Sequence, residues 1–257
     1  MDRLKGKVVL ITGGGSGIGA ATAELVCAEG AAAMLVDADA AALADTAKAI
    51  TERVTDARVA GFVADVAEAS LAMRAVERTL AAFGCMDVLI NNAAMRNYSA
   101  LAEASVEEWQ AVVGVNLIGT ANYCRAALPA LRKNSGASIV NVSSCYALVG
   151  RKGMGLYDAT KAGILAMTRT LAHEEAAHGV RVNAVCPGST LTNFHVARAN
   201  AAGKSLAALK GERQTTSLLG RWATPQEIAW PIIWLASDEA SFVTGATLMV
   251  DGGLSVM

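Results

Sequence analysis

The stretch VVLITGGGSGIG, residues 8–19, decides the fold, because a short apolar run leads straight into a glycine-rich turn. A helical pattern over residues 17–29 follows the turn. Glycine lets the backbone bend tightly and lets a pyrophosphate approach without a Cβ in the way. The start of the helix supplies unpaired N–H groups and the positive end of the helix dipole. The segment therefore predicts a strand, a phosphate-binding turn and a helix in succession.

The spacing of the glycine turn separates three kinds of nucleotide-binding fold. A P-loop ends in Gly-Lys-Ser/Thr, whereas Gly19 is followed by Ala20 and Ala21. The G-x-G-x-x-G fingerprint fits no register of the turn. A methyltransferase that uses S-adenosylmethionine would place an acidic residue where Thr12 stands. The pattern that fits is T-G-x-x-x-G-x-G.

An acidic residue, Asp37, ends the second predicted strand, 18 residues after Gly19. A carboxylate at this place can accept hydrogen bonds from an adenosine ribose and would repel a 2′-phosphate. Arg or Lys inside the turn would favour that phosphate, but the corresponding position is Ser16. The pattern predicts NAD as the cofactor; the alternative is an aspartate that merely faces solvent.

Along the rest of the chain, short apolar runs alternate with longer helical patterns. We expect strands at residues 8–11, 33–36, 58–63, 87–90, 138–142, 180–185 and 247–250. Helices are expected at 17–29, 40–53, 70–83, 105–131 with a break, 157–178 and 225–236. Apolar strands that alternate with helices predict an α/β fold with a parallel sheet covered on both faces.

Residues 189–222 differ from this pattern, because they are polar and show only weak helical periodicity. So long a connection within a compact domain is often a lid, so we expect a candidate substrate lid here. A solvated surface excursion fits the same composition equally well.

Length and charge exclude several classes of protein. The chain has 257 residues, 53% of them hydrophobic, with a net charge of −1, which gives no electrostatic footprint for nucleic acid. Its apolar runs fall far short of the roughly 20 residues that span a membrane. We expect one domain over residues 1–257 and, because the N-terminus lacks the apolar region of a secretory signal, a cytoplasmic protein.

Cysteine and histidine spacing predicts no metal site. The five cysteines are widely spaced without a CxxC pair, so we expect reduced thiols that act as small hydrophobes. His173 and His178 lie five apart, about 140° around a helix, instead of the four that a zinc-protease helix requires.

Tyr157 and Lys161 are four residues apart at the start of a long predicted helix, so they share one face. A tyrosine works as an acid or base near neutral pH only where its phenolate is stabilised, and a neighbouring ammonium does this. Ser144 follows the fifth predicted strand, where its hydroxyl could reach a substrate oxygen. Alone, a Tyr-x-x-x-Lys spacing is common by chance.

Together these pieces resemble the short-chain dehydrogenase/reductase family over essentially the whole chain. The matching segments, in order, are residues 12–19, Asp65-Val66, residues 91–94, Asn116, Ser144 with Tyr157 and Lys161, Pro187-Gly188, residues 244–245 and residues 251–253. The resemblance implies a doubly wound Rossmann-type fold with a seven-stranded parallel sheet. One departure is Ala94, where the family usually has glycine.

The resemblance also implies roles for single residues. Tyr157 would transfer the proton, Lys161 would bind the nicotinamide ribose and lower the tyrosine pKa, and Ser144 would orient the substrate oxygen. Asn116 would hold a water in a proton relay through Lys161. Cofactor contacts are expected from Gly13, Ser16, Gly17, Ile18, Gly19, Asp37, Asp65, Val66, Asn92, Ala93, Tyr157, Lys161, Thr190 and Thr192.

The function that follows is hydride transfer between NAD and a secondary alcohol or ketone, by a homotetramer or homodimer, with no metal, membrane or nucleic-acid partner. One alternative is a non-catalytic NAD sensor on the same fold, although a sensor needs only the glycine turn and Asp37. Another is a nucleotide-sugar epimerase or dehydratase, whose members usually carry a larger C-terminal substrate domain.

The substrate pocket is the least determined part. Met95, Arg96, Tyr146, Arg151 and Arg213 are its candidate residues, and His195 and Arg198 lie in the candidate lid. The apolar and aromatic members favour a hydrophobic alcohol. The basic members raise the possibility of a carboxylate or sulfonate held by Arg96, Arg151 or Arg213. The alternative is that these arginines are ordinary solvated surface charges.

Overall fold

The computed structural model describes residues 2–257, within which seven parallel strands form one sheet in the order β3-β2-β1-β4-β5-β6-β7. The strands are β1 (Val8–Thr12), β2 (Ala32–Asp37), β3 (Arg58–Val63), β4 (Val88–Asn91), β5 (Ser138–Val142), β6 (Arg181–Pro187) and β7 (Thr247–Val250). The predicted seven-stranded, doubly wound sheet is therefore confirmed.

The α-helices are α1 (Gly17–Ala28), α2 (Ala40–Arg53), α3 (Ala69–Phe83), α4 (Val106–Val113), α5 (Gly119–Leu131), α6 (Gly155–Glu175), α7 (Asn193–Ala201), α8 (Leu206–Gly211) and α9 (Pro225–Ala236). Two capping boxes explain where helices begin: Ser105 with Glu108 opens α4, and Thr224 with Glu227 opens α9. A π-helical turn over residues 114–118 joins α4 to α5.

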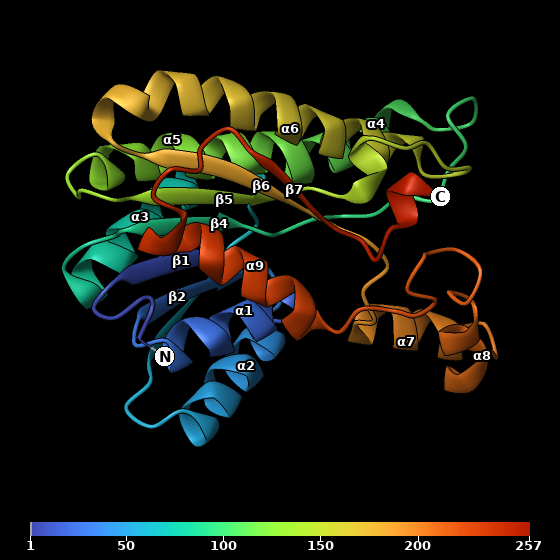
Figure 1. Ribbon diagram of the computed structural model, residues 1–257, viewed down its shortest axis with the longest axis horizontal. Coiled ribbons are helices and arrows are strands. Elements are labelled where there is room, and N and C mark those ends of the chain that lie inside the picture. The colour runs from blue at the N-terminus through green and yellow to red at the C-terminus, as the bar shows by residue number, and fades with distance from the viewer. Residues whose placement is uncertain (1) are drawn as a thin grey trace.

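Helices cover both faces of the sheet (Figure 1). One face is covered by α1, α2 and α9, which share a core with the buried side chains of β1, β2 and β4. The other face carries α3, α5 and α6, and its core includes the fully buried Tyr123. Strands buried on both faces are apolar throughout, which is why their sequences do not alternate.

The order of the strands reverses between β1 and β4, since β2 and β3 lie to one side and β5, β6 and β7 to the other. In open parallel sheets, ligands bind beyond the carboxyl ends of the strands at such a switch point. The glycine turn follows β1, and Asn92 follows β4. The topology therefore brings both segments to the crevice where a ligand is expected.

Residues 189–222 contain two short helices, α7 and α8, which project beyond the sheet on the right of Figure 1. Ala199 of α7, Leu209 of α8 and Trp222 bury one another in a small core separate from those of the sheet. The Trp222 indole N–H also donates to the Leu209 carbonyl oxygen at 2.8 Å. The segment is thus a folded unit rather than an irregular excursion.

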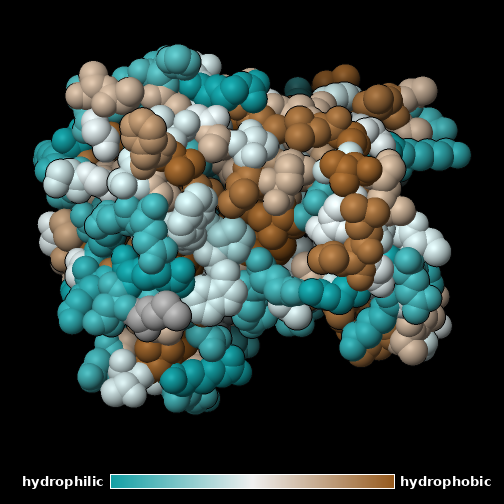
Figure 2. Space-filling model, in the orientation of Figure 1, coloured by the Kyte–Doolittle hydropathy of each residue, from teal (hydrophilic) through white to brown (hydrophobic). Residues whose placement is uncertain are grey.

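Hydrophobic residues gather in Figure 2 on the side of the molecule that carries the C-terminal turn and the 212–222 loop. Exposed members of this patch are Leu218, Leu219, Val256 and Met257. Among residues 2–257, no helix has the length and apolar character needed to cross a membrane.

Candidate active site

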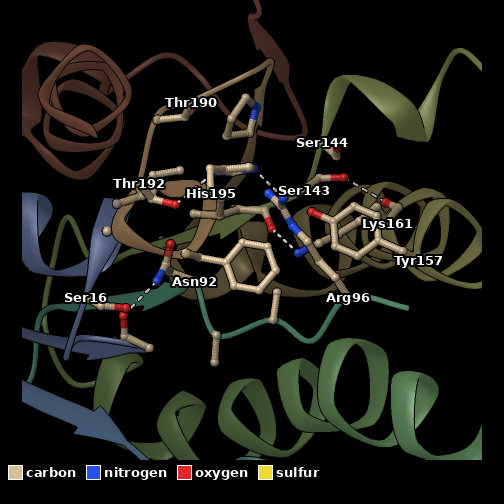
Figure 3. Close-up of a pocket in the computed structure, with 18 of the residues that line it drawn as sticks. Ser16, Asn92, Arg96, Ser143, Ser144, Tyr157, Lys161, Thr190, Thr192 and His195 are labelled. Atoms are coloured by element: carbon tan, nitrogen blue, oxygen red, sulfur yellow. Dashed lines mark hydrogen bonds between the residues drawn. The ribbon is translucent and has the colours of Figure 1, made fainter. Parts of the chain in front are cut away.

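A cavity of about 600 Å³ opens at the switch point of the sheet. It extends from the loops after β1, β2 and β3 to the start of α6 and the α7–α8 segment (Figure 3). Predicted site residues in its lining are Gly13, Ser16, Gly17, Ile18, Asp37, Asp65, Val66, Asn92, Ala93, Arg96, Ser144, Tyr146, Arg151, Tyr157, Lys161, Thr190, Thr192 and Arg213. Gly19, Met95 and Asn116 lie outside the lining.

Glycine is required in the turn after β1 for steric reasons. Gly13 has a φ of +64° and Gly17 a φ of +54°, conformations that other residues rarely adopt. A Cβ on Gly19 would lie 1.9 Å from the Gly13 carbonyl oxygen. The Asn92 side chain fixes the same turn by donating to the Thr12 and Gly13 carbonyl oxygens at 3.1 and 3.0 Å. Gly19 thus shapes the loop without lining the cavity.

The first turn of α1 is open toward the cavity. Its N-cap residue, Ser16, makes no side-chain capping hydrogen bond, so the side chain leaves the first N–H groups available. A Cβ on Gly17 would come within 3.1 Å of Thr192 Cγ2 across this opening. A glycine-lined helix N-terminus of this kind fits a pyrophosphate group.

Acidic residues occupy the opposite end of the cavity from Tyr157. The Asp37 carboxylate accepts from the backbone N–H of Gly15 at 2.9 Å and of Asp39 at 3.1 Å, so it ties the glycine turn to the end of β2. Asp65 accepts from the Ala67 N–H at 2.9 Å. The lining therefore combines carboxylates at one end with a phosphate-binding turn in the middle, which fits a nicotinamide dinucleotide.

Tyr157 and Lys161 come from the first turns of α6 and are both buried. The Lys161 Nζ lies 5.5 Å from the centre of the Tyr157 ring and donates to the Val142 carbonyl oxygen at 2.7 Å. Burial, with the repulsion of Arg96, lowers the pKa of Lys161 to about 7. Burial raises the pKa of Tyr157, while the charges of Arg96 and Arg151 act in the opposite direction.

Two serines follow β5 and face this pair (Figure 3). The Ser144 hydroxyl accepts from the Tyr146 N–H at 3.2 Å, and its proximity lowers the pKa of Tyr157. The Ser143 hydroxyl donates to the Lys161 carbonyl oxygen at 2.7 Å, which joins β5 to α6. Sequence reasoning missed Ser143, which lines the cavity as Ser144 does.

Asn116 lies in the π-helical turn between α4 and α5, and its side chain is fully buried. The amide oxygen accepts from the Met95 N–H at 2.7 Å. The amide nitrogen donates to the Met95 carbonyl oxygen and to the Thr160 hydroxyl, both at 3.0 Å. In this structure the Asn116 side chain fixes the loop that carries Met95 and Arg96. Its expected relay through Lys161 stays a prediction.

The candidate substrate residues do not behave alike. Met95 has its backbone hydrogen-bonded to Asn116, and the residue is 40% exposed. Arg151 is paired with Asp158 at 3.0 Å and lies over the Tyr146 ring at 3.7 Å. Arg96 and Arg213 also line the cavity, but neither is neutralised as Arg151 is. Tyr98, Phe194 and Trp222, which sequence reasoning did not assign to the pocket, line it as well. Tyr98 comes from the loop after β4, whereas the folding of residues 189–222 brings Phe194 and Trp222 there.

The cysteine and acidic side chains of residues 2–257 form no disulfide and no metal-binding cluster. All five cysteines are free thiols, four of them buried. Within the described residues, no group of three or more His, Cys, Asp or Glu side chains is placed to hold a metal ion.

Comparisons with known proteins cover essentially the whole chain. A family model described as enoyl-(acyl carrier protein) reductase matches residues 13–255. A short chain dehydrogenase/reductase of Aspergillus oryzae is 38% identical, over 99% of this chain and 97% of its own. The 2-(S)-hydroxypropyl-CoM dehydrogenase 3 of Xanthobacter autotrophicus is 37% identical, over 100% and 99%. The ligand-free aldohexose dehydrogenase of Thermoplasma acidophilum has a TM-score of 0.89 and 30% identity, over 100% and 96% of the two chains.

Proposed function

The chain belongs to the short-chain dehydrogenase/reductase family of oxidoreductases, and we propose that it transfers a hydride between NAD and a secondary alcohol or ketone. The observation that carries the proposal is that one cavity holds Ser144, Tyr157 and Lys161 together with the glycine turn. A relative that acts by name on a 2-(S)-hydroxypropyl compound supports a secondary alcohol as the substrate class.

NAD rather than NADP is supported by charge. Asp37 lines the cavity beside the glycine turn, and its carboxylate is held in place by two backbone N–H groups. A fixed negative charge there accepts ribose hydroxyl groups and repels a 2′-phosphate. Gly13, Ser16, Gly17 and Ile18 would hold the pyrophosphate, and Asp65 and Val66 the adenine.

When bound, the oxidised cofactor would accept the hydride from the alcohol, and the reduced cofactor would donate it to the ketone. The protein's part is to move a proton and to hold the substrate oxygen. In the oxidation direction the Tyr157 phenolate takes the proton of the alcohol, and in reduction the Tyr157 hydroxyl returns it. Ser144 orients the same oxygen with a hydrogen bond. Lys161, buried beside the ring, adds positive charge when it is protonated.

Self-association and a cytoplasmic setting are further parts of the proposal. The patch of Leu218, Leu219, Val256 and Met257 exposes apolar surface that a second copy of the chain could cover, as in a homodimer or homotetramer. Five free thiols suit a reducing compartment.

A spectrophotometric panel tests the reaction. Secondary alcohols are offered with NAD and with NADP, and their ketones with the reduced cofactors, while the reduced-nicotinamide absorbance is followed. We expect turnover with at least one alcohol–ketone pair and a higher kcat/KM with NAD. The proposed reaction would be contradicted if the protein binds NADH but no pair changes the absorbance in either direction.

A further inference from the structure

Three arginines converge at the end of the cavity away from Asp37 and Asp65. Arg96 comes from the loop after β4, Arg198 from α7 and Arg213 from the turn after α8, and all three line the cavity. We call these residues the arginine cluster. They surround His195, whose Nε2 atom lies 2.6 Å from the Arg96 guanidinium. Figure 3 shows Arg96 between His195 and Tyr157.

Each arginine of the cluster is held by an aromatic ring. The Arg198 guanidinium lies 3.9 Å from the centre of the Tyr98 ring. The Arg213 guanidinium lies 4.5 Å from the Trp222 ring, and that of Arg96 5.3 Å from the Phe194 ring. A guanidinium stacked on a ring keeps the N–H groups along its edge available, so stacking orients the donors without using them.

Few carboxylates neutralise the positive charge of the arginine cluster. Arg213 has Glu212 at 4.0 Å, but the same carboxylate is bonded to Lys204. Among residues 2–257, neither Arg96 nor Arg198 forms an ion pair, and the buried Nε of Arg213 has no hydrogen-bond partner. Arg151, by contrast, is neutralised by Asp158. Arg96 and Arg213 are half-buried, whereas Arg198 is exposed. Half-buried charges are usually paired, so the positive charge of Arg96 and Arg213 favours an anion in the cavity.

The histidine in the middle of the cluster does not reduce its positive charge. Burial and the charges of Arg96, Arg213 and Arg198 lower the pKa of His195 to about 4, so the ring is neutral at pH 7. The positive charges of three guanidinium groups therefore act together at one end of the cavity. The Arg96 guanidinium is also close to Tyr157, 5.8 Å from the centre of its ring.

We propose that the arginine cluster binds an anionic group of the substrate, a carboxylate, sulfonate or phosphate, carried on a compact apolar or aromatic body. The proposal rests on the function proposed above, because it places that anion on the alcohol or ketone that Tyr157 acts upon. The rings of Tyr98, Phe194 and Trp222 form the walls that the apolar body would contact. The closeness of Arg96 to Tyr157 places the anion only a few bonds from the reacting carbon.

Binding of small aryl anions tests the cluster without requiring turnover. Benzoate, benzenesulfonate and phenyl phosphate are titrated calorimetrically into the whole protein, with benzamide as the neutral analogue of benzoate. Saturating NAD blocks the glycine turn, which could also bind an anion. We expect at least one anion to bind at least about tenfold more tightly than benzamide, the ratio that ~1.4 kcal/mol produces. The order among the three anions identifies the head group.

Single-charge variants locate the site. Arg198→Gln and Arg213→Gln each remove one guanidinium, and each is expected to weaken the preferred anion about tenfold or more, since a charge-assisted hydrogen bond is lost. Lys210→Gln is the matched control, because it removes one positive charge from exposed α8 outside the cavity. NADH affinity, read from its fluorescence, should be unchanged in all three variants.

The outcomes separate the two proposals. The anion site would be wrong if benzamide binds as tightly as every anion, or if Lys210→Gln weakens binding as much as Arg198→Gln. It would also be wrong if the wild-type protein binds NADH but none of the anions. If the anions bind with the expected variant pattern but neither NAD nor NADH binds, the anion site stands and the proposed dehydrogenase function fails.

Discussion

The Arg96 guanidinium and the His195 ring form a hydrogen bond of 2.6 Å between two groups that both often carry positive charge. Arginine can only donate, so His195 Nε2 must accept and be unprotonated. Its proton then lies on Nδ1, 3.0 Å from the Thr192 hydroxyl oxygen, which accepts it. The Thr192 O–H is thereby left to donate elsewhere in the cavity. The pair thus connects the arginine cluster to Thr192 beside the glycine turn.

This geometry predicts a histidine that stays neutral. With a pKa lowered to about 4 by burial and neighbouring arginines, His195 should keep one ring proton, on Nδ1, from pH 5 upward. Nitrogen-15 NMR of histidine-labelled protein reads the ring state, and His195→Gln assigns the signal. A His195 ring that titrates near its ordinary pKa of about 6.5, or that carries its proton on Nε2, would refute the arrangement.

The lowered pKa of His195 also predicts how the stability of the folded protein changes with pH. Unfolded His195 takes up a proton near pH 6.5, whereas the folded ring does so only near pH 4. The unfolded state therefore binds more protons between these values, and this residue makes the folded protein lose stability as the pH falls through that window. His195→Gln should flatten the pH dependence of the unfolding free energy between pH 4 and 6.5, measured with urea, relative to the wild type.

Arg96 should affect the proton chemistry as well as substrate binding. Burial raises the pKa of Tyr157, and Arg96 is the strongest charge that lowers it. Oxidation needs the phenolate, so its rate should rise with pH, and Arg96→Gln should move that rise to higher pH. Arg151→Gln, whose charge is already paired with Asp158, should produce a smaller shift. Equal shifts, or a pH optimum near 5, would contradict this assignment.

The glycine turn predicts a contrast between two substitutions of the same kind. Gly19→Ala places a Cβ against the Gly13 carbonyl, so it should cost about 1–3 kcal/mol or more and abolish NADH binding. Gly211→Ala meets no atom within 4 Å, so stability and NADH binding should be nearly unchanged. Thermal unfolding and NADH fluorescence measure both effects. NADH binding that survives Gly19→Ala would show that the turn is not the cofactor site.

Asp37 predicts the choice of cofactor. Asp37→Asn keeps the shape of the side chain and removes its charge, so the preference for NAD over NADP should shrink by roughly tenfold, which corresponds to ~1.4 kcal/mol. Asp45→Asn removes a charge from an exposed position on α2 and should leave the ratio alone. Dissociation constants for NADH and NADPH give the ratio. A wild type that prefers NADPH would overturn the role of Asp37.

The sequence predicted the fold well because its signals are local. Apolar runs and helix caps depend on neighbouring residues, so the structure confirms every predicted strand within about two residues of its bounds. The α7 and α8 helices were not predicted, because each buries one main side chain, Ala199 or Leu209, and so lacks a periodic apolar face.

The site was predictable where its residues lie at the ends of strands or on a helix. Asp37, Ser144 and Tyr157 are placed by the ends of strands and by one helix, which are elements that the sequence reveals. The partners of the arginines are not, because Arg96 meets His195 99 residues away and only the folded 189–222 segment brings them together. The pairing of Arg151 with Asp158 likewise depends on how the start of α6 meets the preceding loop.

The measurement that tests the central claim most directly compares two tyrosine variants. Tyr157→Phe keeps the buried ring and removes the transferable proton, so kcat with the best alcohol of the panel should fall by about 10²–10⁴-fold while NADH still binds. Tyr123→Phe makes the same chemical change at a buried hydroxyl that has no hydrogen-bond partner among residues 2–257, and should keep full activity. A Tyr157→Phe enzyme that turns over as fast as Tyr123→Phe would contradict the account.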